Sequence, residues 1–233
     1  MKKEYKSLAV IHILVLLGML MIGLAGEGAV TVIAENKLEK SRHHIIIDAG
    51  HGGIDGGAVS CTGVLESGIN LEIALRLQDL SHLLGYDTVM IRTTDISIHT
   101  SGQTIAQKKI SDLKERVRII NSVENGVLLS IHQNYFPDDR YSGAQVFYNG
   151  DEESAKLANI LQDSFLAALN PGSNRKVKKA KGIYLMEHID CTGALIECGF
   201  LSNYQEEMKL RSEEYQKQLC CVIVAGLSKY LNT

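Results

Sequence analysis

From about residue 43 onward, short runs rich in Val, Ile or Leu alternate with longer segments of helical periodicity. This alternation constrains the fold more than any other feature of the chain. It indicates strands separated by helices, and therefore an α/β domain with a largely covered sheet. The sequence shows no internal repeat that would favour a solenoid. The predicted strands span residues 44–48, 86–92, 127–132, 144–148 and 194–198.

Four helices are expected between and after these strands. Their predicted spans are residues 70–84, 112–121, 154–169 and 213–231. Ser111 is the predicted N-cap of the second helix, and Gly85 is expected to end the first. Residues 93–110 mix turn formers with few apolar anchors, so a long surface loop is expected there.

The N-terminus carries an apolar run that covers residues 8–25 after several lysines. A run of this length lies near the lower limit of about 17 residues for a spanning helix, and it exceeds the usual core of a signal peptide. Residues 1–34 are therefore predicted to be a signal peptide or an N-terminal membrane anchor. Residues 35–42 would then form a linker, and residues 43–233 the catalytic domain, exported to the outer side of the cytoplasmic membrane.

Charge and cysteine content exclude some classes of protein. With 24 basic and 27 acidic residues, the chain has no broad basic surface for nucleic acid, and we expect no nucleic-acid partner. The basic stretch 174–182 is either a solvated loop or a contact for an anionic polymer or membrane. Five cysteines without a C-x-x-C motif favour neither a cysteine zinc site nor a thioredoxin-like site. Cys191 and Cys198 could form a bridge or remain free thiols.

A glycine-rich turn, IIIDAGHGGIDGGA, follows the first predicted strand. A phosphate-binding P-loop would need Lys and then Ser or Thr after Gly57, where Ala58 and Val59 stand. The dinucleotide-binding pattern would need glycine at Asp55. What remains is a turn that places His51 at the carboxyl edge of the sheet, where open α/β sheets bind ligands.

A second histidine, His132, follows another apolar run and would reach the same edge. Glu66 precedes the helix predicted at 70–84, in a loop that could fold over that edge. Two histidines and one glutamate form a ligand set of catalytic zinc sites. Each residue alone could equally be a turn histidine, a core histidine or an exposed acid.

Glu197 interrupts the apolar run of TGALIECGFLSN. A carboxylate buried in a strand is costly unless it is paired, protonated or bound to a metal. Either a structural ion pair or a proton-transferring group beside a metal would explain its presence. Beside zinc, Glu197 would accept a proton from water and pass it to a leaving amine.

These stretches, with GVLESGINLEIALRL and LLSIHQN, resemble the four motifs of zinc-dependent N-acetylmuramoyl-L-alanine amidases of the type-3 family. The resemblance covers about residues 43–231. It implies a twisted, mostly parallel sheet flanked by helices, one Zn²⁺ ion bound by His51, Glu66 and His132, and Glu197 as the catalytic acid or base. The implied reaction cleaves the amide between the lactyl group of muramic acid and L-alanine in peptidoglycan.

A bare domain behind one export segment resembles the sporulation branch of the family, which trims spore-cortex peptidoglycan before muramic lactam forms. The expected partner is peptidoglycan, and whether an accessory protein helps to load the metal stays open. Gln133, Asn134 and Tyr135 stand where many relatives have small residues, so the wall of the groove is expected to differ.

Several alternatives stay open at this point. A zinc carboxypeptidase would share the ligand set but needs an arginine for the terminal carboxylate, and Arg92 and Arg116 are candidates. A non-catalytic peptidoglycan-binding module could have kept the fold. Cys61 as a nucleophile would leave both glutamates without a role. Asp48 and Asn134 could each orient a ligand histidine or simply bond within their turns.

Overall fold

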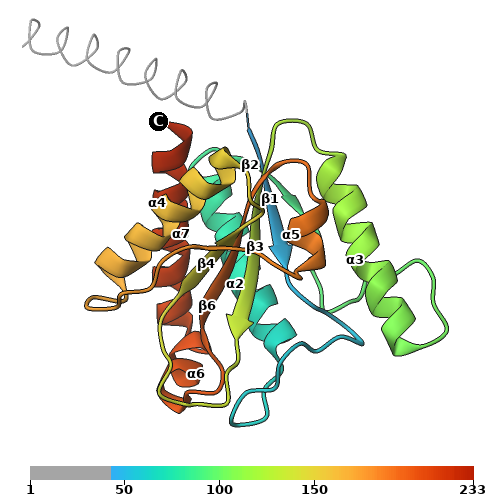
Figure 1. The fold of residues 1–233 in the computed structure, drawn as a ribbon, viewed down its shortest axis with the longest axis horizontal. Helices are drawn as coiled ribbons and strands as arrows, with labels where there is room; N and C mark the ends of the chain where they lie inside the picture. Colours follow the sequence, from blue (N-terminus) through green and yellow to red (C-terminus); the bar gives the residue numbers. More distant parts are fainter. Residues whose placement is uncertain (1–42) are drawn as a thin grey trace, which may run out of the picture. The chain divides into compact units, whose positions relative to one another are not determined.

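Six strands form one sheet in the order β2-β1-β3-β6-β4-β5 in the computed structural model, which describes residues 43–233 (Figure 1). The predicted export segment and linker lie outside the described residues. The strands are β1 (His44–Ala49), β2 (Asp87–Met90), β3 (Gly126–Asn134), β4 (Gln145–Tyr148), β5 (Lys178–Lys179) and β6 (Thr192–Phe200).

The centre of the sheet is parallel. Strands β2, β1, β3 and β6 pair in parallel, whereas β4 pairs antiparallel with β6 and carries the short edge strand β5. The expectation of an α/β domain with a mostly parallel sheet flanked by helices is confirmed. Parallel neighbours end at the same edge, so the residues that follow β1 and close β3 lie near one another.

Helices cover both faces of the sheet (Figure 1). One face packs on α2 (Glu66–Leu83), α4 (Glu152–Ala168) and α7 (Glu213–Leu231), and the other on α3 (Ile105–Asn121) and α5 (Tyr184–His188). A short helix, α6 (Tyr204–Leu210), follows β6. In β1, Ile45 and Ile47 face the first layer and Ile46 the second, which explains a strand apolar on both faces.

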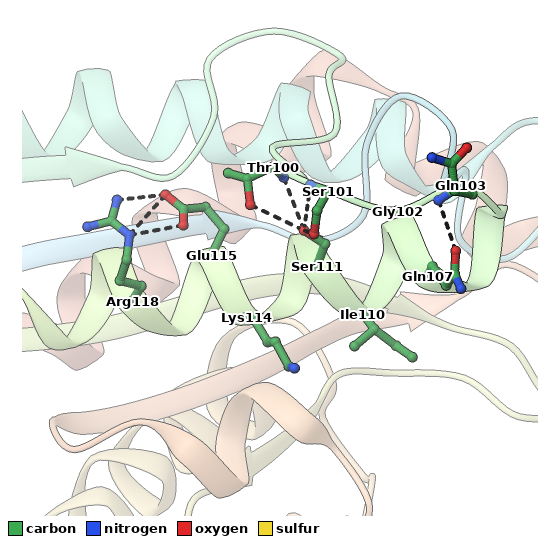
Figure 2. Close-up of a pocket in the computed structure, with 10 residues that line it drawn as sticks. All are labelled: Thr100, Ser101, Gly102, Gln103, Gln107, Ile110, Ser111, Lys114, Glu115 and Arg118. Atoms are coloured by element: carbon green, nitrogen blue, oxygen red, sulfur yellow. Dashed lines mark hydrogen bonds and ion pairs between the residues drawn. The ribbon is translucent and has the colours of Figure 1, made fainter.

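The helix predicted at 112–121 is longer than expected. It begins at Ile105, because Thr104 and Gln107 form a capping box. Ser111 is therefore not a cap, and the loop predicted over residues 93–110 is shorter. The Ser111 hydroxyl accepts hydrogen bonds from the backbone N–H groups of Thr100 and Ser101, each at 3.1 Å, and so holds that loop against α3 (Figure 2).

The helix predicted at 70–84 also begins earlier, at Glu66, so this residue lies in the first turn of α2 and not in a loop. Gly85 follows the helix end with a φ of 82°, as its predicted role as the stop requires. The short elements β5, α5 and α6 were not predicted.

All five cysteines lie within residues 43–233 and are free thiols. Cys191 packs against the layer of α3 and α5, whereas Cys198 belongs to the opposite core. These two residues therefore do not form a bridge. Among residues 43–233, no helix is both long and apolar enough to span a membrane.

Candidate metal centre

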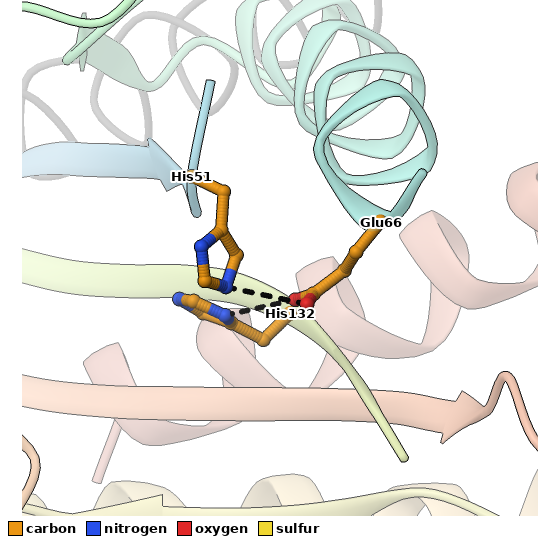
Figure 3. Close-up of side chains that lie close together, drawn as sticks. All are labelled: His51, Glu66 and His132. Carbon is orange, nitrogen blue, oxygen red and sulfur yellow. Dashed lines mark hydrogen bonds and ion pairs between the residues drawn. The ribbon is translucent and has the colours of Figure 1, made fainter. Parts of the chain in front are cut away.

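The predicted site residues gather at the carboxyl edge of the parallel strands. His51 follows β1, and His132 lies near the end of β3. Strand β1 lies between β2 and β3, so the connections out of β1 and β2 leave toward opposite sides of the sheet. Open α/β sheets bind ligands at such a point of reversal. Glu66 reaches the same place from the start of α2 (Figure 3).

Three side chains converge closely there. The His51 Nε2 atom lies 3.2 Å from Glu66 Oε2, and His132 Nδ1 lies 3.0 Å from Glu66 Oε1. The potential ligand atoms of the three residues all lie within 4.8 Å of one another. Figure 3 shows both imidazole rings directed at the one carboxylate. This is the one such convergence of three metal-binding side chains among residues 43–233.

The turn after β1 holds His51 in an unusual conformation. Its φ of 62° falls in the left-handed region, which non-glycine residues seldom adopt. Its Nδ1 atom is 2.9 Å from Asp55 Oδ2, which leaves Nε2 for a ligand. Burial alone would lower the pKa of His51, but hydrogen bonds to Asp55 and Glu66 outweigh burial and raise it to about 9.

Two glycines make room for these rings. A Cβ atom on Gly50 would stand 2.2 Å from the His132 ring. A Cβ atom on Gly57 would stand 2.5 Å from Glu66 Oε2 and 2.7 Å from the His51 ring. The glycine-rich turn therefore allows the backbone to approach the cluster.

Two buried arginines hold the turn after β1 in place through hydrogen bonds to its backbone carbonyl oxygens. Arg116 of α3 pairs with Asp48 and donates to the carbonyl oxygens of Ala49 (2.9 Å) and His51 (2.6 Å). Arg92 donates to the carbonyl oxygens of Ala49, Gly50, Ser67 and Thr94. Because both guanidinium groups are buried and engaged in this way, neither is available for the terminal carboxylate of a carboxypeptidase substrate.

Glu66 is buried and receives many hydrogen bonds. Its Oε1 atom accepts from Gln133 N at 3.1 Å and Asn70 Nδ2 at 3.0 Å, and its Oε2 atom accepts from Ala58 N at 2.9 Å. Burial opposes ionisation, but the two histidines outweigh it and hold the pKa of Glu66 far below its ordinary value. The carboxylate is therefore charged, as a metal ligand must be.

Glu197 lies beside this cluster on β6, where it is the register partner of His132. Its Oε2 atom is buried and has no hydrogen-bond partner within residues 43–233. Burial raises the pKa of Glu197 to about 7, from an ordinary value of 4.5. An unpaired carboxyl poised near neutrality suits proton transfer better than a structural ion pair.

The donor set fits zinc. Two imidazole nitrogens and one carboxylate converge from three separate elements, and Asp55 fixes the orientation of the first imidazole. The fourth group, Glu197, keeps an unpaired oxygen next to the cluster and is free for another role.

Other sequence expectations turned out differently. Asp48 and Asn134 make no hydrogen bond to either histidine; Asp48 bonds Arg116 and Ser130. Asp55, which does orient His51, was missed, although it stands only four residues further along the chain. Gln133 supports Glu66 through its backbone and bonds Asn70. Cys61 is exposed, and its backbone N–H donates to the carbonyl oxygen of Leu201. These contacts give no support to a nucleophilic role.

Comparison with known proteins decides the family. Residues 45–229 match the protein family described as N-acetylmuramoyl-L-alanine amidase. The chain belongs to this family. The germination-specific N-acetylmuramoyl-L-alanine amidase of Bacillus subtilis is 39% identical over 188 residues, which cover 80% of this chain and 78% of that protein. The resemblance seen in the four motifs is thus confirmed.

Solved structures of amidases share the fold. The CwlD amidase of Clostridioides difficile, solved in complex with the GerS lipoprotein, is 37% identical and superposes with a TM-score of 0.78. The match covers 81% of this chain and 98% of that one. An N-acetylmuramoyl-L-alanine amidase of Clostridium difficile 630 is 31% identical with a TM-score of 0.70, over 82% of this chain and 97% of that one.

Proposed function

We propose that this protein is a zinc-dependent hydrolase that cleaves the amide between the lactyl group of N-acetylmuramic acid and L-alanine of the stem peptide. The observation that carries the proposal is the convergence of His51, Glu66 and His132 beside the unpaired oxygen of Glu197, in a chain of the amidase family. No covalent intermediate is required.

In this proposal His51, Glu66 and His132 hold one zinc ion. When bound, zinc supplies a Lewis acid that activates water and polarises the amide carbonyl. Glu197 accepts a proton from the attacking water and gives it to the nitrogen of the leaving L-alanine, so that a carboxylate and an amine are released. Asp55, which bonds the His51 ring, and Arg116, which bonds the His51 carbonyl oxygen, keep His51 in place during the reaction.

We place this activity in spore-cortex maturation, because the Bacillus subtilis relative is germination-specific. The substrate would then be cortex peptidoglycan outside the cytoplasmic membrane, and residues 1–34 would serve as the export signal or anchor. A lipoprotein is a reasonable accessory partner to test, since the Clostridioides difficile amidase was solved with one.

The test combines metal analysis with digestion. The purified chain is stripped of metal, reloaded with increasing amounts of Zn²⁺, and incubated with isolated peptidoglycan. Release of soluble peptides should require zinc and should saturate at one ion per chain. Equal release by the stripped protein would contradict the proposal.

A further inference from the structure

Arg175 lies at the same edge of the sheet as the metal centre, on the far side of β6. Its guanidinium covers the rings of Phe200 and Tyr141, at 4.7 and 5.9 Å from their centroids. Its Nε–H donates to the Ser142 carbonyl at 2.9 Å, and its Nη1 donates to Gln145 Oε1 at 3.3 Å. These contacts hold the planar group in one orientation.

The guanidinium nevertheless keeps unused donors. Arginine has five N–H groups, and only two of those on Arg175 make hydrogen bonds within residues 43–233. The side chain forms part of the wall of a cavity of about 740 Å³. Other lining residues include Ser142, Asn170, Asn203 and Lys209. Free donors on a fixed arginine that faces a cavity form a binding site for a planar anion such as a carboxylate.

The charges around this cavity favour an anion on balance. Lys209 and Arg140 also line it, and Arg140 is paired with Asp138 at 2.6 Å. Glu206 is the one carboxylate among the lining residues, and its Oε2 atom already accepts from the Gly143 N–H at 2.6 Å. Glu206 makes no ion pair with Arg175, so the guanidinium charge is not neutralised by contact.

The cavity lies within reach of the reacting bond. Gln145, which bonds Arg175, is the register partner of Glu197 on the adjacent strand. Adjacent strands lie about 4.8 Å apart, so the guanidinium is on the order of 10 Å from the Glu197 carboxyl. An extended peptide covers that distance in about three residues, at roughly 3.3 to 3.6 Å each.

We infer that Arg175 and its cavity form a subsite for a carboxylate of the stem peptide, two or three residues beyond the amide that is cleaved. The inference rests on the proposed function for the identity of the peptide. Its physical basis, a fixed guanidinium with free donors one strand away from Glu197, is independent of catalysis.

The test is equilibrium binding, which does not require cleavage. The peptide L-Ala-D-Glu-L-Ala, with both carboxyl groups free or both amidated, is titrated into the full chain by calorimetry. The free acid should bind about tenfold more tightly, the usual scale for one hydrogen bond between charged groups. In Arg175→Gln the two peptides should bind equally, and the amidated peptide should bind as it does to the wild type.

Arg118→Gln is the matched control, because Arg118 is an exposed arginine on α3 outside this cavity. It removes the same charge and should keep the tenfold preference. If Arg175→Gln unfolds, Arg175→Lys replaces it; the preference should then fall below that of the wild type, because an ammonium lacks the paired N–H groups.

Equal binding of the two peptides by the wild type would overturn the inference. A preference that survives in Arg175→Gln would overturn it as well, and would locate carboxylate binding elsewhere, for instance at the metal. If the binding pattern is as expected but the wild type cleaves no peptidoglycan, the proposed function fails while the subsite stands.

Discussion

Changing Glu197 to Gln should separate proton transfer from metal binding. Glutamine keeps the size of the side chain and one carbonyl oxygen, but it cannot accept a proton at neutral pH. Because Glu197 is not one of the three converging side chains, zinc should stay bound at one ion per chain. Loss of a general base lowers the rate by about 10² to 10⁴.

The same change has a measurable effect on stability without metal. Burial raises the pKa of Glu197 from 4.5 to about 7, so the folded protein binds this proton more tightly than the unfolded chain does. The contribution of this bound proton to the free energy of unfolding is complete below pH 4.5 and is lost as the pH rises through 7. At about 1.36 kcal/mol per pKa unit, the free energy of unfolding of the wild type falls by roughly 3 kcal/mol over this pH range. The glutamine variant, which has no carboxyl to ionise at this position, does not show this loss.

Urea unfolding of the metal-free proteins, followed by circular dichroism at pH 5 and pH 8, measures this difference. The free energy of unfolding of Glu197→Gln minus that of the wild type should be about 2 to 3 kcal/mol larger at pH 8 than at pH 5. Zinc content and peptide release are measured on the same preparations.

Three results would refute this reasoning. Loss of zinc in Glu197→Gln would make Glu197 a ligand, and Glu66 would become the candidate base. Full activity with bound zinc would make Glu197 a structural residue. A pH-independent stability difference would mean that the carboxyl is not buried in the way described.

The remaining predictions concern the ligands, their support and the N-terminus. His51→Ala and His132→Ala should each lower zinc content, measured by mass spectrometry of the metal, together with activity; near-normal zinc in either variant would contradict the site. Asp55→Ala should weaken zinc binding by about 10- to 100-fold in a competition assay with a chelator, and unchanged affinity would remove its orienting role. Arg116→Ala should lower the free energy of unfolding by about 3 to 5 kcal/mol in urea, because it removes the ion-pair partner of the buried Asp48 and Asp112; a loss below 1 kcal/mol would count against the buried network. A reporter fused after Asn36 should be active only outside the cytoplasmic membrane, and activity confined to the cytoplasm would refute export.

The sequence predicted which side chains gather at this edge of the sheet better than it predicted the contacts around them. His51 and His132 were recognisable because each follows an apolar run of residues, and parallel strands bring such residues to one edge. Glu197 stood out because a carboxylate interrupts an apolar run. Glu66 was expected in a loop, but it begins α2, where a negative charge is favourable.

The supporting contacts could not be predicted, because they depend on tertiary packing. The hydrogen bond from Arg116 of α3 to the carbonyl oxygen of His51 joins two residues that lie 65 positions apart in the sequence. The early start of α3 was missed because its capping box, Thr104 and Gln107, lies in a stretch rich in turn formers. The subsite proposed at Arg175 likewise depends on rings that approach it only in the fold.

The identity of the bond that is cleaved tests the central claim most directly. Isolated peptidoglycan is digested with the zinc-loaded chain, and the soluble products are analysed by mass spectrometry. We predict peptides with a free N-terminal L-alanine and glycan strands whose lactyl groups end in a carboxylate. Release of single amino acids from the peptide ends, or no new amino terminus at L-alanine, would contradict the assignment of this chain as an N-acetylmuramoyl-L-alanine amidase.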